Sequence, residues 1–464
     1  MSNDFQKADP DELTKEEYER MKEEKLQYTL DFVYNNNPFY REMMDEEGYV
    51  PEDFKTFEDL KKLPVINSET IKNNQPPKAE KNKLYTPGTD VRRPYQTSGT
   101  SGNPKTILKS YDELENIYEE AKRGFELYDI SEDDVFVNYF PFVALNPSGD
   151  YGEGLIDKLG ATSVPISNTP YPPKIEYSML KQFNPDVIMG LASHVDAKGR
   201  IFKEIGANPQ ELGVNVISLA GEPVTESRKK HISETFGAEV YDFLATTESG
   251  GFAYQCKENE SLYHVLDNFV HVEIIGEDKE RLEEGEEGHL AVTNLLNPGE
   301  ESAMPLLRYD LKDIVSEYNT DIRDCGCDIN SSISISSPKR EAWEFIVGAV
   351  NLNAKFVEDK IYNHDDIGEV TKGYQVKLDY EEDEGDIMNV LVETNEENLL
   401  KEKAEVTEKK SPENKAEEIA QSLLEHQQLR DTVENMKSSK IKVNFVRDIE
   451  MPKGKPQRVK DLRD

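Results

Sequence analysis

The fold class can be inferred from "VNVISLAGEPVTESRKKHISETFGAEVYDFL", residues 214–244. This stretch opens on a short apolar run (214–221), passes through helix-like sequence that closes at Gly237, and ends in a second apolar run (239–244). A strand, a helix and another strand in succession are typical of parallel strands joined by a covering helix. The stretch therefore predicts an α/β architecture.

The same alternation extends toward the N-terminus. Further short apolar runs are "DVFVNYF" (134–140), "ATSVPIS" (161–167) and "PDVIMGLAS" (185–193), and helix-like segments lie between several of them. We expect doubly covered sheets that bind ligands at the carboxyl ends of their strands. Capping boxes mark two earlier helix starts, Thr14 with Glu17 and Ser110 with Glu113, and the first helical region is expected to run to about Tyr49.

After about residue 260 the pattern changes. The runs "FVHVEII" (269–275), "GHLAVTNLL" (288–296) and "PLLRYDLKDIV" (305–315) are typical of antiparallel strands joined by charged turns. A small β-β-α-β unit is expected to follow, built from 373–380, 387–394, a helix starting at Ser411-Pro412, and 440–446; the charged stretch 398–418 is expected to be a flexible loop. The expected domains are therefore 1–338 and 339–464.

The charge balance restricts the partners. With 93 acidic and 55 basic residues among 464, the net charge is −38. This excess argues against nucleic acid or an anionic membrane as a partner, and it favours a protein adapted to a high-salt cytoplasm, with a merely well-solvated surface as the alternative. The N-terminus lacks the apolar core of a signal peptide, and no apolar run approaches the roughly 18 residues of a membrane span. We expect a cytoplasmic protein; the sequence leaves a homodimer open.

The stretch "TSGTSGNPK" (97–105) has the composition of an anion-binding turn. Gly99 and Gly102 let successive backbone N–H groups face one anion, hydroxyl side chains add donors, and Lys105 can meet phosphate charge. It is not a Walker loop, because the lysine does not directly follow the second glycine. Ser/Thr/Gly turns also occur in ordinary surface loops, so the stretch alone leaves phosphate binding open.

Five segments in order carry a resemblance. They are "TSGTSGNPK" (97–105), "SLAGEPVTESRKKHISETFGAEVYDFLATTE" (218–248), "GEEGHLAVTNL" (285–295), "MPLLRYDLKD" (304–313) and "PKGKPQRVKDLRD" (452–464). Over roughly residues 20–464 the chain resembles the adenylate-forming superfamily, most closely its phenylacetate–CoA ligase-like branch. The resemblance implies a large N-terminal domain of doubly covered sheets plus a distorted β-barrel, and a small mobile α+β C-terminal domain.

The resemblance also implies a two-step reaction. A carboxylate, expected to be aromatic, attacks the α-phosphate of ATP with Mg²⁺ bound, which gives an acyl-AMP and pyrophosphate; coenzyme A then displaces AMP. Two alternatives stay open: an adenylyltransferase or acyl-AMP enzyme with an acceptor other than coenzyme A, similar to the deazaflavin-adenylylating synthetases, and a nucleotide-binding protein that has lost catalysis.

The resemblance assigns roles by position. The residues that match are Thr97, Ser98, Gly99, Thr100, Ser101, Gly102 and Lys105 in the phosphate loop; Gly221, Glu222 and Pro223 in the adenine turn; Thr247 with Glu248, the Mg²⁺ ligand; Asp313 for the ribose; Arg340 at the domain junction; and Lys455, which assists adenylation. Ordinary alternatives remain. Thr247 and Glu248 also fit a turn after a strand, Asp313 also fits an ion pair with Arg308 or Lys312, and Lys455 also fits a solvated tail.

Two departures from the family pattern bear on the acceptor. Leu244 and Ala245 stand where relatives have an adenine-stacking aromatic residue and a glycine. At the junction, Ala342 and Trp343 replace two acids, and Gly348-Ala349 replaces an arginine-glycine pair. Domain rotation and the coenzyme A step are therefore less certain from the sequence than adenylation.

Two further groups are candidate sites. Cys256, His264, Cys325 and Cys327 have the ligand types of a closed structural zinc site, which some members of the ligase branch share, with His271 as a substitute fourth ligand. Free buried thiols beside a surface histidine are the alternative. The acid pocket is expected near Phe142, Ser193 and His194, although aromatic residues more often belong to a core.

Overall fold

The computed structural model describes residues 9–97, 104–142, 145–167, 171–222, 224–319, 325–327, 329–340, 344–347, 350–381, 385–406, 411–430, 433, 439–449 and 458–462. The chain forms two compact units, one of residues 1–168 with 242–338 and one of residues 169–241 with 339–464. The expected domains 1–338 and 339–464 stay a prediction; they differ from these two units, in which residues 169–241 are grouped with the C-terminal segment. None of the described helices is long and apolar enough to cross a membrane.

The first unit contains two helices whose starts were predicted from capping boxes. Its helices are α1 (Lys15–Asn36), α2 (Pro38–Glu47), α3 (Ser68–Asn73), α4 (Tyr111–Glu126) and α5 (Ser148–Leu159), with 3-10 turns at Pro10–Glu12, Pro51–Asp53 and Phe57–Lys62. The capping boxes at Thr14 and Ser110 are both present. The helical region expected to reach Tyr49 is divided, because Asn37 caps a new helix that starts at Pro38.

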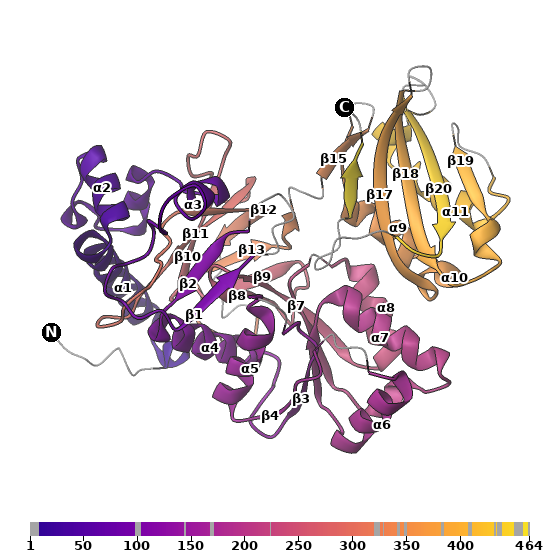
Figure 1. Ribbon diagram of the computed structural model, residues 1–464, viewed down its shortest axis with the longest axis horizontal. Coiled ribbons are helices and arrows are strands. Elements are labelled where there is room, and N and C mark those ends of the chain that lie inside the picture. The colour runs from indigo at the N-terminus through magenta and orange to yellow at the C-terminus, as the bar shows by residue number, and fades with distance from the viewer. Residues whose placement is uncertain are drawn as a thin grey trace. The chain divides into compact units, whose positions relative to one another are not determined.

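The strands of the first unit form a hairpin, a parallel pair and an antiparallel sheet (Figure 1). They are β1 (Arg93–Gln96), β2 (Thr106–Lys109), β3 (Val135–Asn138), β4 (Thr162–Val164), β8 (Gly250–Gln255), β9 (Leu262–Val265), β10 (Val270–Ile275), β11 (Glu287–Asn294), β12 (Tyr309–Asn319) and β13 (Ile333–Ser336). The pairing order β10-β11-β12-β13-β9-β8 is antiparallel throughout, which confirms the antiparallel strands predicted after residue 260.

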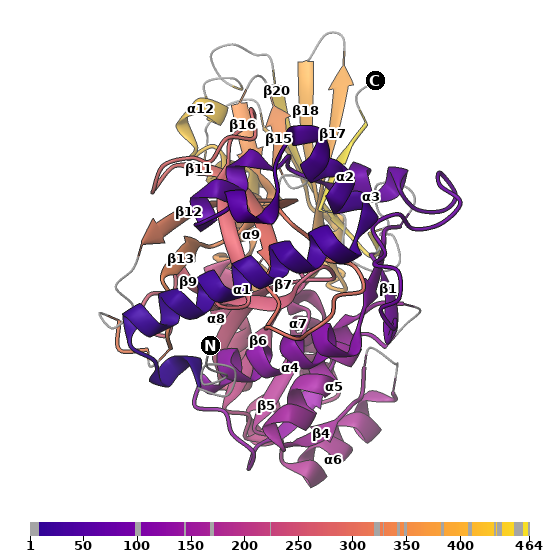
Figure 2. The same cartoon turned by 90° about the vertical axis from the view of Figure 1, so that its left-hand side faces the viewer.

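Helix α1 covers part of this antiparallel sheet. Its residues Leu26 and Leu30 are fully buried in one core with Val270 and Val292 of the strands. Figure 2 shows the helix as a long indigo ribbon running obliquely across the strands. The buried hydroxyl of Thr29 accepts a hydrogen bond from the backbone N–H of Leu296 at 2.9 Å, so the contact is polar as well as apolar.

The second unit contains the strand–helix–strand stretch that predicted the fold. Its N-terminal part holds α6 (Pro173–Phe183), β5 (Val187–Gly190), α7 (Ala192–Glu204), a 3-10 turn at Pro209–Leu212, β6 (Val216–Leu219), α8 (Glu226–Phe236) and the start of β7 (Glu239–Thr246). Strands β5 and β6 are parallel. Helix α8 ends at Gly237, whose φ of 70° is readily adopted by glycine. The α/β prediction is confirmed.

The C-terminal part of the second unit is an α+β assembly. It contains β14 (Lys339–Arg340), the hairpin β15 (Glu344–Val347) and β16 (Val350–Asn353), α9 (Ala354–Tyr362), α10 (Asp365–Gly368), β17 (Thr371–Glu381), β18 (Gly385–Thr394), a 3-10 turn at Leu399–Lys401, β19 (Lys403–Val406), α11 (Lys415–Leu423), α12 (Gln427–Arg430), β20 (Ser439–Val446) and β21 (Val459–Asp461). The sheet order is β19-β20-β18-β17-β21. Residues of α9 and α11 share the core of this sheet.

Two local expectations in this part were wrong. Strand β19 lies within the stretch expected to be a loop, because it pairs with β20 and thereby satisfies its backbone groups. Helix α11 starts at Lys415 rather than at Ser411-Pro412, because the side chain of Asn414 accepts the N–H of Glu417 and caps it.

Candidate active site

The hairpin β1–β2 carries the glycine-rich stretch. Its register ends at Gln96 opposite Thr106, and Thr97 and Lys105 close the base with two hydrogen bonds: Thr97 N–H to Lys105 O at 3.1 Å, and Lys105 N–H to Thr97 Oγ1 at 3.2 Å. The buried Gln75 braces the second strand by accepting the N–H of Thr106 at 2.8 Å. Lys105 is therefore held at one end of the loop. Ser98, Gly99, Thr100, Ser101 and Gly102 lie outside the described residues.

Lys105 contacts the predicted Mg²⁺ ligand directly. Its Nζ lies 2.5 Å from Glu248 Oε1 and 2.6 Å from the hydroxyl of Tyr309. The Tyr309 hydroxyl also lies 3.2 Å from Glu248 Oε1, so the three groups form a closed triangle. Two predicted site residues, 143 positions apart, are thus brought together in one unit.

This arrangement keeps Glu248 ionised despite its burial. Only 4% of the residue is exposed, and burial by itself would raise the pKa of its carboxyl. The charge of Lys105 and the hydrogen bonds from Lys105 and Tyr309 outweigh that effect and lower the pKa of Glu248. A buried carboxylate that stays charged is suited to hold a hard divalent cation.

The backbone around Glu248 is also fixed. Thr247 and Glu248 lie in the turn between β7 and β8, and the carbonyl of Glu248 accepts hydrogen bonds from Lys109 Nζ at 2.7 Å and from Asn294 Nδ2 at 3.1 Å. Tyr151 donates to the carbonyl of Thr247 at 3.2 Å. Three side chains from three different elements therefore hold this turn.

Glycine is required immediately after the turn. Gly250 has a φ of 74°, and a Cβ there would lie 2.6 Å from a methyl carbon of Ile117. Both the backbone angle and the close approach of α4 exclude a side chain. The turn is thus packed against α4 with no room for adjustment.

Asp313 lies on a bulge of β12. The register pairs His289 with Ile314 and Ala291 with Asp310, so three residues of β12 stand opposite the single residue Leu290. Within the bulge, Lys312 has a φ of 64° and the Asp313 side chain is buried. Bulges of this kind re-aim side chains and are frequent beside functional sites. Arg308, one alternative partner named for Asp313, forms a buried ion pair with Glu273 at 3.0 Å.

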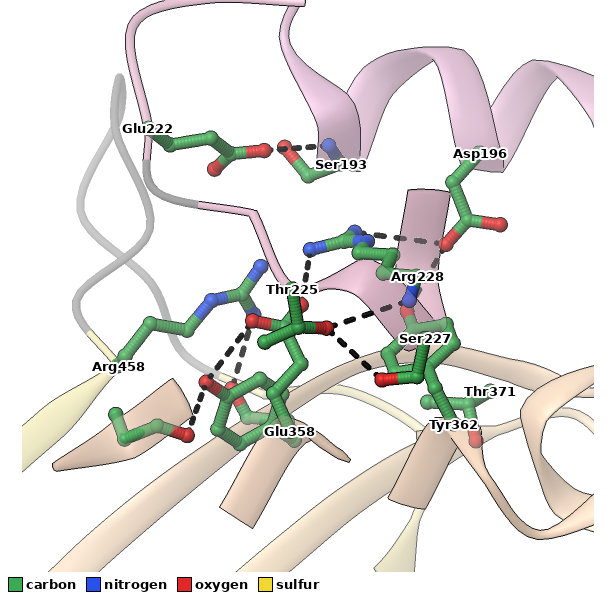
Figure 3. Close-up of polar contacts among 12 residues, drawn as sticks. Ser193, Asp196, Glu222, Thr225, Ser227, Arg228, Glu358, Tyr362, Thr371 and Arg458 are labelled. Carbon is green, nitrogen blue, oxygen red and sulfur yellow. Dashed lines mark hydrogen bonds and ion pairs between the residues drawn. The ribbon is translucent and has the colours of Figure 1, made fainter. Parts of the chain in front are cut away.

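The adenine turn lies in the second unit, after the carboxyl end of β6. Gly221 has a φ of 86°, and the carboxylate of Glu222 accepts a hydrogen bond from the backbone N–H of Ser193, in the first turn of α7 (Figure 3). Because β5 and β6 are parallel neighbours, the segments that follow them meet at one edge. The structure thus brings Ser193, from the expected acid pocket, to Glu222. Pro223 lies outside the described residues.

The remaining predicted residues have separate surroundings. Phe142 is 45% exposed, and its ring packs so closely on Gly149 that a Cβ there would lie 2.8 Å away. His194 lies beside Ser193 in α7. Arg340 belongs to β14, but its side chain is not among the described ones, and Lys455 lies outside the described residues, as do Ala342 and Trp343. The roles of these residues stay predictions.

The four candidate metal ligands do come together. One ligand atom from each of Cys256, His264, Cys325 and Cys327 lies within 4.8 Å of the others. Cys256 Sγ is 3.7 Å from Cys327 Sγ, and Cys325 Sγ is 3.5 Å from His264 Nε2. Burial lowers the pKa of His264 to about 4 and raises the pKa of Cys327 to about 12.

His271, the substitute ligand, is not one of this group. Its ring stacks on Phe57 with the centroids 4.2 Å apart.

Sequence reasoning missed four residues of the site: Tyr309, Lys109, Asn294 and Tyr151. Tyr309 lies inside a segment already singled out, and its phenol is almost fully buried, so its hydroxyl needed a polar partner. Lys109 and Asn294 are recognisable only from the fold, because they bond to a backbone carbonyl more than 40 residues away in sequence.

Comparison with known proteins places this geometry in a family. A family model described as "AMP-binding enzyme" matches residues 41–295, more than half of the chain. The phenylacetate-coenzyme A ligase of Thermus thermophilus is 27% identical over 300 residues, 64% of this chain and 65% of the relative. The Escherichia coli enzyme of the same name is 26% identical over 315 residues, 66% and 69% of the two chains. The chain thus spans about two thirds of the length of the curated relatives it matches.

Solved structures share the fold. A 2-hydroxyisobutyryl-CoA ligase in a postadenylation state aligns with a TM-score of 0.77 at 17% identity, covering 97% of this chain and 90% of that one. The same enzyme in a thioesterification state aligns with a TM-score of 0.64 at 18% identity, covering 97% and 91%. An anthranilate CoA ligase aligns with a TM-score of 0.53 at 13% identity, covering 80% and 66%. With its family match, its fold and the Lys105–Glu248 pair in agreement, the chain belongs to the AMP-binding enzyme family.

Proposed function

We propose that the protein is an ATP-dependent acid–thiol ligase. It activates an organic carboxylic acid as an acyl-AMP and then transfers the acyl group to coenzyme A. The observation that carries the proposal is the Lys105–Glu248–Tyr309 triangle at the base of the glycine-rich hairpin, in a chain of the AMP-binding family. The curated relatives it resembles are phenylacetate-coenzyme A ligases, which supports an aromatic acid as the substrate class.

The chemistry requires positive charge where two anions meet. A carboxylate must approach the α-phosphate of ATP, and Lys105 supplies a fixed ammonium group at the end of the phosphate loop. Glu248, kept ionised while buried, would hold a magnesium ion, which withdraws charge from the phosphate oxygens when bound. Asp313 would bind the ribose hydroxyls, the Gly221–Glu222 turn would contact adenine, and Lys455 would assist the adenylation step.

Carboxylate-dependent exchange of pyrophosphate into ATP tests the first half of the reaction. The wild-type protein is assayed with a panel of acids that begins with phenylacetate, each with ATP and Mg²⁺. We expect exchange with at least one aromatic acid, and formation of a thioester when coenzyme A is added. Absence of exchange with every acid would contradict adenylation.

A different acceptor is the second candidate function. Ala342 and Trp343 replace two acids at the junction where relatives change conformation for the second step, and this sequence observation favours an enzyme that passes AMP or the acyl group elsewhere. The same assay separates the two functions: exchange without any thioester would favour the second. A nucleotide-binding protein without catalysis would bind ATP but show no exchange.

We further propose that Cys256, His264, Cys325 and Cys327 hold a structural zinc ion. Two sulfurs bound tetrahedrally to one zinc at about 2.3 Å lie about 3.7 Å apart, far longer than a disulfide bond. The Cys256–Cys327 separation of 3.7 Å fits that geometry. Gly326, with a φ of 75°, provides the turn that lets both flanking cysteines reach one point.

Metal analysis of the purified protein tests the zinc site. We expect about one zinc per chain, and a lower zinc content together with a lower melting temperature in Cys325→Ser. Free thiols that react fully with a thiol reagent in the folded protein, without metal, would support the alternative of unligated cysteines.

Adaptation to high salt is a separate proposal, which rests on the net charge of −38. Self-repulsion of so acidic a folded chain is relieved by screening, so the melting temperature should rise steeply from low salt to molar potassium chloride. A melting temperature independent of salt would contradict it.

A further inference from the structure

A cluster of buried charges in the second unit has no role in the site described above. Arg228 on α8 and Glu358 on α9 form an ion pair with a closest N–O distance of 2.7 Å, and both side chains are fully buried. The two residues are 130 positions apart and come from the two sequence segments that make up this unit. Figure 3 shows the pair at the centre of a network of polar contacts.

Further contacts join the same two segments. Asp196 on α7 lies 3.4 Å from Arg228 and accepts a hydrogen bond from the hydroxyl of Tyr362 at 2.9 Å. Arg200 pairs with Asp196 at 2.9 Å and also donates to the carbonyl of Thr371 at the start of β17. Helices α7 and α8 are therefore tied to α9 and to β17 by charged groups rather than by apolar contacts alone.

This network continues from the adenine turn toward the C-terminal end of the chain. Arg228 lies one turn after the N-cap of α8, Thr225, which follows Glu222 in the β6–α8 connection. On the other side, the Tyr374 hydroxyl donates a hydrogen bond to the Glu358 carboxylate at 3.4 Å. The guanidinium carbon of Arg458 lies 4.7 Å from the centroid of the Tyr374 ring. Arg458 is three residues beyond Lys455 in the sequence.

A buried ion pair of this kind specifies geometry more than it adds stability. Removing two charges from water is costly, and the attraction between them roughly offsets that cost, so apolar residues of similar size would hold the segments together at least as well. The forked guanidinium of arginine, by contrast, satisfies its partners in few orientations. The cluster therefore selects one orientation of the C-terminal segment relative to α7 and α8.

We propose that Arg228 is a positioning residue for adenylation: through Glu358 it holds the C-terminal segment that carries Lys455 in register with the helix that follows the adenine turn. The proposal rests on the proposed function, in which Lys455 assists formation of the acyl-AMP. In that function Lys455 is assigned to the first half-reaction, and no role in the transfer of the acyl group to a thiol is proposed for it. Loss of Arg228 should therefore slow the first half-reaction and spare the second.

The test compares Arg228→Gln with Lys230→Gln, which removes the same charge from an exposed position of the same helix. Pyrophosphate exchange measures the first half, and thioester formation from chemically prepared acyl-AMP measures the second. For Arg228→Gln we expect exchange to fall about tenfold or more, since small misplacements of catalytic groups have effects of this size. Thioester formation by Arg228→Gln should stay within about twofold of the wild-type rate. In Lys230→Gln both half-reactions should stay within about twofold of the wild-type rates. Arg228→Lys keeps the charge but lacks the forked guanidinium. Its pyrophosphate exchange should lie between that of Arg228→Gln and that of Lys230→Gln.

If Arg228→Gln loses both half-reactions equally and has a lower melting temperature, Arg228 only supports the fold and the proposal is wrong. Unchanged pyrophosphate exchange in Arg228→Gln would also overturn the proposal. If Arg228→Gln does not fold, Glu358→Gln removes the same ion pair with a smaller change and carries the same expectations. The double variant should be no slower than the slower single variant, because the two residues act through one contact.

A measurement without turnover separates this proposal from the proposed function. Hydrogen–deuterium exchange of the amides of α9 should be faster in Arg228→Gln than in the wild type and in Lys230→Gln. Unchanged protection of α9 would overturn the positioning role whatever the enzyme activates. Wild-type protein that shows no pyrophosphate exchange, but in which α9 protection depends on Arg228, would contradict the proposed function alone.

Discussion

Two buried ion pairs, one in each unit, use different cations in different surroundings. In the first unit the Lys105 side chain is 14% exposed and meets Glu248 through a single nitrogen. In the second unit Arg228 and Glu358 are completely buried, and the guanidinium also reaches Asp196. Lysine is a flexible point charge that exchanges partners easily, whereas arginine holds several acceptors in a fixed plane.

The difference corresponds to two tasks. In the proposed function, a nucleotide with its metal ion would replace the direct Lys105–Glu248 contact, so that pair would open in every catalytic cycle. The Arg228–Glu358 pair has no access to solvent and serves to orient two segments. Substitutions at the first pair should therefore affect the chemical step, and substitutions at the second pair should affect the orientation of the two segments.

Lys105→Gln should have the largest effect on activity. The substitution removes the ammonium group that offsets phosphate charge, and pyrophosphate exchange should fall about 100-fold or more, as when a single charge-stabilising donor is lost. The melting temperature should change little, because Glu248 can take up a proton once it is no longer paired. A large loss of stability with little loss of exchange would mean that the two pairs do not differ in task.

The same variant should change the acid limb of the pH profile. In the wild type, Lys105 and Tyr309 hold the pKa of Glu248 below its usual value although burial opposes them, so the carboxylate is lost only when the pH falls through that lowered pKa. Without Lys105, burial dominates and the pKa of Glu248 rises. The acid limb of exchange activity should therefore move to higher pH. An unchanged limb would show that Lys105 does not set this pKa.

Tyr309→Phe should have an intermediate effect that depends on magnesium. The ring is kept and only the hydroxyl that bridges Lys105 and Glu248 is lost. A hydrogen bond to a charged group contributes about 1.5 kcal/mol, so exchange at limiting Mg²⁺ should fall about tenfold. If the Tyr309 hydroxyl orients the Glu248 carboxylate, saturating Mg²⁺ should restore most of the exchange activity. A loss of exchange that does not depend on the Mg²⁺ concentration would show that the hydroxyl has a different role.

Ser227→Ala should have the smallest effect. The Ser227 hydroxyl donates to Asp359, beside the Arg228–Glu358 pair, but it is neutral and only partly buried. Because this hydrogen bond to a carboxylate is only partly buried, water can replace the lost hydroxyl, so exchange should fall less than about fivefold and thioester formation should not change. An effect as large as that of Arg228→Gln would mean that any contact between α8 and α9 matters equally.

Several elements could be read from local sequence. The capping boxes at Thr14 and Ser110 and the glycine that ends α8 are as predicted, because a cap is decided by residues within one turn. Strand β19 was missed because "KAEV" has no apolar run of its own, and only β20 makes it a strand. The family, too, was correctly inferred from the order of five segments.

The α/β class and the family could be inferred from the sequence alone, and Lys105 and Glu248 were predicted as site residues, because apolar periodicity and short motifs are local properties. Which of these groups contact one another, and which side chains support them, follows from the packing of the folded chain. The Tyr309 hydroxyl, the bonds from Lys109 and Asn294 to the Glu248 carbonyl, and the Arg228–Glu358 pair all join residues far apart in the chain. Their energies depend on distance and burial, which arise only when the strands and helices are packed.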